Sequence, residues 1–150
     1  MSRLKLGLPE RVFFSTEIPV RVSDLNYDNH MGNDSFLSIA HEARMQFFRH
    51  FGYTELNVEG RRIIMSDAAV VYRSEAFYGD VLRVDIGVGD FTETACDITY
   101  AFWNARTGKE VARLKTGIVF LDQETRKPVP MPSEFRNLFV PSSSPPPDVA

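Results

Sequence analysis

The feature that most constrains the fold is an amphipathic segment at residues 35–51. Its apolar side chains recur at steps of three and four residues, which is the spacing of one buried stripe on an α-helix. These apolar residues are Phe36, Ile39, Ala40, Ala43, Phe47 and Phe51. Asn33 or Asp34 can cap the start of this helix, and Gly52 can end it. The sequence therefore predicts one long helix with a single face that must be covered.

Strand-like segments follow this helix. They lie at about residues 62–73, 80–88, 93–104 and 110–121. A turn-forming segment at 104–109 joins the last two, which predicts a hairpin and hence an antiparallel sheet. A further strand is expected at 12–22, with Pro19 placing it at an edge or marking its end. One helix followed by runs of strands indicates an α+β fold in which the sheet wraps around the helix.

The length of 150 residues suits one domain, and we expect it to span residues 1–140. A short helix is predicted at 133–139, with Ser133 as its cap and with Phe135, Leu138 and Phe139 docking on the body. The Pro- and Ser-rich residues 141–150 are expected to be disordered.

Charge and cysteine content narrow the classes of function. The 17 basic and 20 acidic residues are scattered, which gives no reason to expect a nucleic acid or membrane partner. No apolar run is long enough to span a membrane, and the first residues lack the apolar core of a targeting peptide. The single cysteine, Cys96, excludes an internal disulfide and favours the cytoplasm.

The polar loop before the helix holds the candidate functional residues. Its Asp, Asn and His residues are Asp24, Asn26, Asp28, Asn29, His30, Asn33 and Asp34. Asn and Asp also build ordinary turns and helix caps, so a purely structural role is the alternative. The loop leads through Gly32 into a helix start, where backbone N–H groups and the helix dipole favour a developing oxyanion. This position favours a site for acyl transfer.

The segment RVSDLNYDNHMGNDSFLSIAHEAR, residues 21–44, resembles the signature region of the 4-hydroxybenzoyl-CoA thioesterase-like family of hotdog proteins, and also plant acyl-ACP thioesterases. In that family an Asp-x-Asp pair ends a strand, a His follows four residues later, and a Glu-Ala-Arg element closes the central helix. The matching residues here are Asp24, His30, Gly32, Asn33, Glu42, Ala43 and Arg44. The likeness extends over about residues 17–132.

This resemblance implies a hotdog fold, an antiparallel sheet of five to six strands wrapped around one long central helix. It also implies hydrolysis of an acyl-CoA or acyl-carrier-protein thioester without a cofactor. The protein would assemble as a homodimer or homotetramer by edge-to-edge pairing of sheets, with its sites between subunits at the start of the central helix.

The chain departs from the family pattern at one position. Where the family carries its catalytic carboxylate, this sequence has Asn26. An amide neither accepts a proton at neutral pH nor attacks as a carboxylate nucleophile. The acid has therefore moved, with Asp28 as the first candidate and Asp34 as a weaker one, or hydrolysis has been lost.

The remaining roles are assigned as hypotheses. Asn26, Asp28 or His30 would position or activate water, and the backbone N–H of Met31, Gly32 or Asn33 would hold the carbonyl oxygen. Glu42 is either a second carboxylate near the site or half of an ion pair with Arg44 or another basic residue. The three histidines show no metal-ligand spacing, so no metal site is expected.

Two other functions stay open. A non-hydrolytic protein that binds acyl-CoA or acyl-carrier protein would retain the pocket without the acid, and Asn26 favours this alternative. A hotdog dehydratase or isomerase would need a His and an acid on the helix, for which only His41 and Glu42 are available.

Overall fold

A computed structural model describes residues 2–140 of the chain. Its elements are β1 (Phe14–Pro19), a 3₁₀ turn (Val22–Asp24), α1 (Ser35–His50), β2 (Arg62–Tyr72), β3 (Val81–Gly89), β4 (Ala95–Asn104), β5 (Glu110–Leu121) and α2 (Ser133–Phe139). The predicted strand at 12–22 is shorter than expected, because the chain turns into the 3₁₀ segment directly after Pro19 and Val20. The tail at 141–150 lies outside the described residues.

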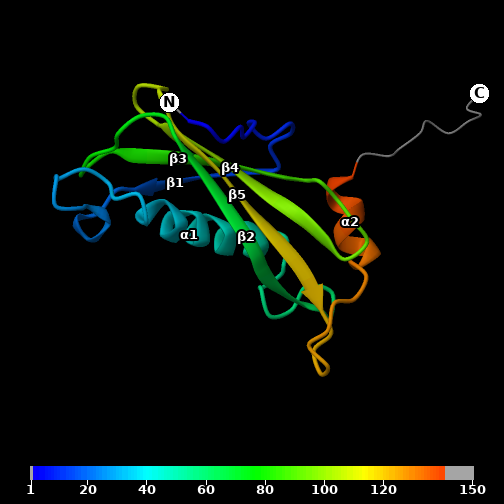
Figure 1. Cartoon of the computed structure of the whole chain (residues 1–150). Helices are drawn as coiled ribbons and strands as arrows, with labels where there is room; N and C mark the ends of the chain where they lie inside the picture. Colours follow the sequence, from blue (N-terminus) through cyan, green and yellow to red (C-terminus); the bar gives the residue numbers. More distant parts are fainter. Residues whose placement is uncertain (1, 141–150) are drawn as a thin grey trace, which may run out of the picture.

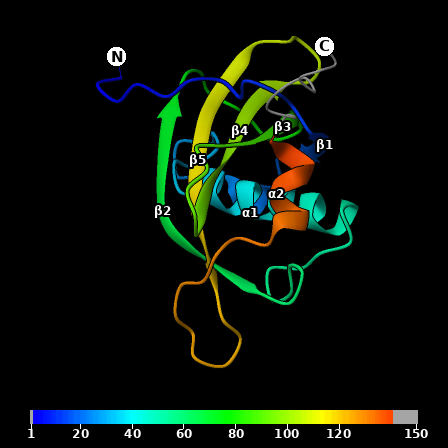
Figure 2. The same cartoon turned by 90° about the vertical axis from the view of Figure 1, so that its right-hand side faces the viewer.

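The strands form one antiparallel sheet in the order β1-β3-β4-β5-β2. The sheet is strongly curved, and α1 lies along its concave side (Figures 1 and 2). The predicted hairpin at 104–109 joins β4 to β5, and Pro19 ends an edge strand as expected. This arrangement is a hotdog fold with five strands, which confirms the prediction made from the sequence.

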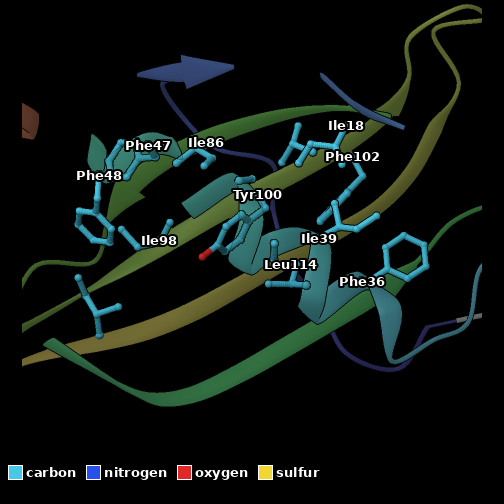
Figure 3. Packing of buried hydrophobic residues seen from close by; sticks show 14 of the residues in the cluster. Ile18, Phe36, Ile39, Phe47, Phe48, Ile86, Ile98, Tyr100, Phe102 and Leu114 are labelled. Atoms are coloured by element: carbon cyan, nitrogen blue, oxygen red, sulfur yellow. The ribbon is translucent and has the colours of Figure 1, made fainter. Parts of the chain in front are cut away.

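The core lies between α1 and the inner face of the sheet (Figure 3). The predicted helical stripe is buried except for Phe51, which is half-buried just past the end of α1. Opposite it lie inward-facing strand residues, among them Ile18, Ile86, Ile98, Tyr100, Phe102 and Leu114. Each large apolar side chain removed from water stabilises the fold by about 1.5–3 kcal/mol, so this layer fixes where α1 begins relative to the sheet.

Both ends of α1 are set by local chemistry. Asp34 occupies the N-cap position without a side-chain cap hydrogen bond. Instead, Ser35 Oγ donates to the backbone oxygen of Asp24 at 2.9 Å and ties the helix start to the preceding loop. At the other end Gly52 adopts φ +83°, a left-handed conformation that glycine takes without strain.

Two expectations for the C-terminal helix α2 are wrong. Pro132, and not Ser133, is its N-cap residue; its φ of −58° and ψ of 135° provide the extended backbone that precedes a helix. Leu138 is 44% exposed and does not dock, whereas Phe135 and Phe139 are buried as predicted. No helix in the described part of the chain is both long and apolar enough to cross a membrane.

Residues 2–13, here called the N-terminal segment, contact the outer sheet face. Phe13 N–H donates to the backbone oxygen of Ile86 at 2.8 Å, and Arg113 Nη1 donates to the backbone oxygen of Leu6 at 2.9 Å. At Gly87 a Cβ atom would lie 2.7 Å from both the backbone oxygen of Arg11 and the Cβ of Pro9. The segment therefore packs on the sheet backbone itself.

Candidate active site

Two loops that are far apart in the sequence lie side by side. Residues 21–34, the site loop, lead into α1, and residues 73–80, the facing loop, connect β2 to β3. Met31 N–H donates to the backbone oxygen of Ala76 at 2.8 Å, and His30 forms an antiparallel bridge with Phe77. These backbone contacts hold the two loops together at the start of α1.

Asn26 closes a tight turn inside the site loop. Its N–H donates to the backbone oxygen of His30 at 2.9 Å, and its side-chain Oδ1 accepts the N–H of Asp28, also at 2.9 Å. Asn29, at the tip, has φ 65°, a left-handed conformation that asparagine tolerates better than most residues. The amide at position 26 thus has a structural role in addition to its predicted role in the site.

A pocket of about 530 Å³ opens between the site loop, the start of α1, the end of β2 and the facing loop. Its lining residues are Asn26, Tyr27, His30, Met31, Asn33, Phe36, Tyr72, Arg73, Ser74, Glu75 and Ala76. Phe36 and Tyr72 form an edge-to-face pair with ring centroids 5.4 Å apart, which gives one aromatic wall. The structure thus brings Asn26, His30, Met31 and Asn33 to one pocket.

His30 is held in a defined orientation at this pocket. Its Nδ1 lies 3.2 Å from the backbone oxygen of Met31. A carbonyl oxygen only accepts hydrogen bonds, so Nδ1 carries the proton and Nε2 bears a lone pair in the neutral ring. Nε2 lies 3.6 Å from Oε2 of Glu75. The ring nitrogen that can accept a proton therefore lies close to a carboxylate.

Sequence reasoning missed Glu75. It comes from the facing loop, 45 positions after His30, and its side chain is 63% exposed. No motif around it, Arg-Ser-Glu-Ala, indicates a functional residue. Only the pairing of the two loops places it at the site.

Two of the three predicted oxyanion donors are already bonded. Met31 N–H donates to Ala76, and Gly32 N–H donates to the backbone oxygen of Asp24 at 2.9 Å. Both N–H groups therefore already have an acceptor within the chain. The geometry does not support the prediction that Met31 or Gly32 holds the carbonyl oxygen of a substrate. Asn33 N–H has no acceptor among the described residues.

Tyr72 fixes the position of Asn33. Its hydroxyl donates to the backbone oxygen of Asn33 at 2.9 Å. Burial, and then the negative charge of Asp34, raise the pKa of Tyr72, so the hydroxyl remains a donor at neutral pH. A hydrogen bond from β2 therefore orients the start of α1.

The other predicted carboxylates lie outside this pocket. Asp28 is exposed at the tip of the site loop and does not line the pocket. Asp34 is also exposed and lines no part of it. Glu42 is exposed on α1 and accepts a hydrogen bond from Nε2 of Gln46 at 2.7 Å. Among the described residues none of these three carboxylates forms a hydrogen bond or ion pair with His30.

The ion pair suggested between Glu42 and Arg44 is absent in the described residues. Arg44 Nε instead donates to Oε2 of Glu55 at 2.6 Å. His41 lies 3.9 Å from Oε1 of the same Glu55, so His41 and Glu42 do not form a pair. Among residues 2–140 no group of three His, Cys, Asp or Glu side chains is arranged to hold a metal ion.

Comparisons with known proteins agree with this architecture. A search of curated protein sequences finds no match. Among solved structures, a 1,4-dihydroxy-2-naphthoyl-CoA thioesterase from Synechocystis is similar with a TM-score of 0.77 and 21% identity, over 88% of this chain and 98% of that one. A thioesterase superfamily protein from Jannaschia has a TM-score of 0.78 and 19% identity, over 89% and 84% of the two chains.

A third similar structure is the DHNA-CoA thioesterase of Staphylococcus aureus, with a TM-score of 0.71 and 19% identity over 83% and 84% of the chains. At these identities the structural likeness establishes the fold. The model of the thioesterase-like superfamily matches residues 20–139, which include the whole site loop, the pocket and strands β2 to β5. This chain belongs to the thioesterase-like superfamily.

Proposed function

We propose that this protein hydrolyses an acyl thioester of coenzyme A or of an acyl-carrier protein in the pocket at the start of α1. The orientation of His30 is the observation that carries the proposal: Nδ1–H is bonded to Met31, and Nε2 is left as an acceptor beside the pocket. A histidine in this state can accept or relay a proton near neutral pH. Membership of the thioesterase-like superfamily supports this choice of reaction.

The remaining pocket residues suit a thioester. The acyl group would lie against Phe36 and Tyr72, with its carbonyl oxygen directed to Asn33 N–H at the positive end of α1. Water held at His30 would attack the carbonyl carbon, and the tetrahedral intermediate would expel the thiolate. The products are a carboxylic acid and a free thiol, and the proton lost by water ends on the thiol.

The pocket volume of about 530 Å³ is in the range of small-molecule sites, roughly 300–1,000 Å³. Two of the similar structures are thioesterases of a coenzyme A ester by their names, which supports coenzyme A as one carrier here. We place the protein in the cytoplasm, because its single cysteine, Cys96, suits a reducing compartment.

We also propose that two copies pair through β2 to form a homodimer, and that two such dimers can associate into a homotetramer. Among the described residues β2 is hydrogen-bonded only to β5, so its other edge is open. Ile64 and Met65 on this strand are 43% and 36% exposed, and a second copy of the edge would cover them. Sedimentation of the purified chain, with Ile64→Lys as the disrupting variant, tests this assembly; a monomeric wild-type chain contradicts it.

Released thiol provides the test of the reaction. The wild-type protein is incubated with short, medium, long and aromatic acyl-CoAs and with acyl-carrier protein. We expect turnover on at least one class and a loss of about a hundredfold or more in His30→Ala. His41→Ala is the matched control, because His41 is exposed on α1 and does not line this pocket. Absence of turnover on the whole panel contradicts the proposal.

A non-hydrolytic binder of acyl-CoA or acyl-carrier protein is the second candidate. Two observations favour it: the family's acid position is the amide Asn26, and the nearest substitute, Asp28, lies outside the pocket. A saturable rise in melting temperature with palmitoyl-CoA or benzoyl-CoA, without thiol release, would select this function. Such binding should weaken when Phe36 or Tyr72 is replaced by a polar residue.

A further inference from the structure

The pocket contains one carboxylate within the described residues, and it is Glu75. We infer that Glu75 is the general base of the reaction. It would take the role of the family's acid, whose position is occupied by Asn26 in this chain. This inference rests on the proposed function, since it assigns a role within the same site. Glu75 lies in the facing loop between β2 and β3, and no feature of the sequence indicates that it is functional.

The geometry of the two acceptors supports this role. Glu75 Oε2 and His30 Nε2 are 3.6 Å apart. With neutral His30 and ionised Glu75, both atoms only accept hydrogen bonds, so neither donates to the other. A water molecule lying against both can donate one hydrogen to each, which leaves its oxygen lone pair directed away from them. The pair is therefore suited to hold and polarise an attacking water.

The backbone on both sides of Glu75 is fixed. Before it, Ser74 Oγ donates to the backbone oxygen of Glu110 at 2.7 Å. After it, the backbone oxygen of Ala76 accepts Met31 N–H at 2.8 Å, and Phe77 N–H donates to Asp80 Oδ2 at 2.9 Å. The side chain is exposed, but it projects from a segment that is tied to the sheet and to the site loop.

Among the residues that the structure describes, no Lys or Arg side chain forms an ion pair with Glu75. Arg73 lines the same pocket, but its Nε lies 3.6 Å from Glu110 and forms an ion pair there. Within residues 2–140 the side chain that lies against the Glu75 carboxylate is the ring of His30, which carries no charge in its neutral form. Glu75 is thus available to take a proton, whereas Glu42, Asp28 and Asp34 lie outside the pocket.

The reaction balances with Glu75 as the base. Its carboxylate takes a proton from water as the oxygen bonds to the thioester carbon, and Asn33 N–H holds the resulting oxyanion. The carbon–sulfur bond then breaks, and the proton passes from Glu75, directly or through His30 Nε2, to the leaving thiolate. Glu75 returns to its ionised form, and no other reactant is needed.

The test compares Glu75→Gln with Glu124→Gln on the best acyl-CoA substrate of the wild-type protein. Glu75→Gln should lower kcat by about a hundredfold or more and leave KM close to the wild-type value. Glu124→Gln, which changes an exposed carboxylate in the turn after β5, should keep kcat within about threefold of wild type. Unchanged melting temperatures would show that both variants are folded.

Chemical rescue separates a base from a structural residue. Glu75→Ala removes the carboxylate and leaves space, so added sodium formate should restore part of kcat in this variant and none in His30→Ala. Wild-type kcat in Glu75→Gln, or a Glu75→Ala variant that formate fails to rescue, would overturn the role of Glu75 while thioester hydrolysis stands. A wild-type protein without turnover would overturn both.

Discussion

Arg44 on α1 donates a hydrogen bond from Nη1 to the hydroxyl of Tyr100 on β4, at 3.0 Å, inside the core. The Tyr100 hydroxyl also lies 2.8 Å from Thr116 Oγ1 on β5. Together with Glu55, which bonds Arg44 Nε, these residues form a polar network that connects the helix to two central strands. Every charged or hydroxyl group in this network has a partner, as burial requires.

Replacing Arg44 with Met should therefore destabilise the protein by about 3 kcal/mol, because Glu55 and the Tyr100 hydroxyl each lose a buried partner. Urea unfolding at neutral pH measures this change. Arg49→Met, on the exposed face near the end of α1, is the control and should change stability by less than about 0.5 kcal/mol. Equal effects of the two changes would mean that the network adds nothing.

Asn26→Asp should create or raise thioesterase activity. The side chain lines the pocket, and a carboxylate oxygen can still accept the N–H of Asp28, so the loop should keep its turn. We expect kcat to rise at least about tenfold, measured by thiol release. Asn29→Asp adds the same charge at the loop tip, outside the pocket, and should leave kcat unchanged. An inert Asn26→Asp would argue against equating position 26 with the acid of the family.

Gly87→Ala should detach the N-terminal segment from the sheet. The new methyl group meets backbone and ring atoms of Arg11 and Pro9, which cannot move away as a flexible side chain can. We expect a loss of about 2 kcal/mol and faster hydrogen exchange at the Phe13 amide, which donates to the backbone oxygen of Ile86. Gly89→Ala is the matched control, because nothing lies within 4 Å of its added Cβ. Exchange that stays slow in Gly87→Ala would contradict this packing.

Cys96 should be inert in the folded protein. Burial, and then the charge of Asp97, raise the pKa of this thiol to about 12, so almost no thiolate forms at pH 8. Ellman's reagent should label less than about a tenth of the native protein within the time in which urea-unfolded protein is fully labelled. Fast labelling of the native chain would refute this. The same inertness keeps the background low when released coenzyme A is measured.

The sequence predicted the elements well because their signals are local. The helical stripe from Phe36 to Phe47 and the turn at 104–109 identify themselves by spacing and composition, and their bounds are nearly as expected. The cap of α2 was misassigned since Pro132 and Ser133 are both acceptable at a helix start, and only the backbone conformation distinguishes them.

The site was predictable only in part, because local sequence patterns do not reveal contacts between distant segments. His30 and Asn33 lie on one continuous loop that the sequence marks as unusual, and both line the pocket. Glu75 reaches the pocket through a contact between distant segments, which no local pattern encodes. The donors Met31 and Gly32 were misjudged because their N–H groups bond to Ala76 and Asp24, partners that appear only when the chain is folded.

The backbone contacts of His30 with Phe77 and of Met31 with Ala76 join the two walls of the pocket into one rigid unit. A ligand cannot separate the site loop from the facing loop without breaking these backbone contacts. Neither loop is therefore free to move by itself and close over a bound ligand. Discrimination among acyl groups would then follow from fit to a preformed shape, and bound and empty forms of this region should superpose closely.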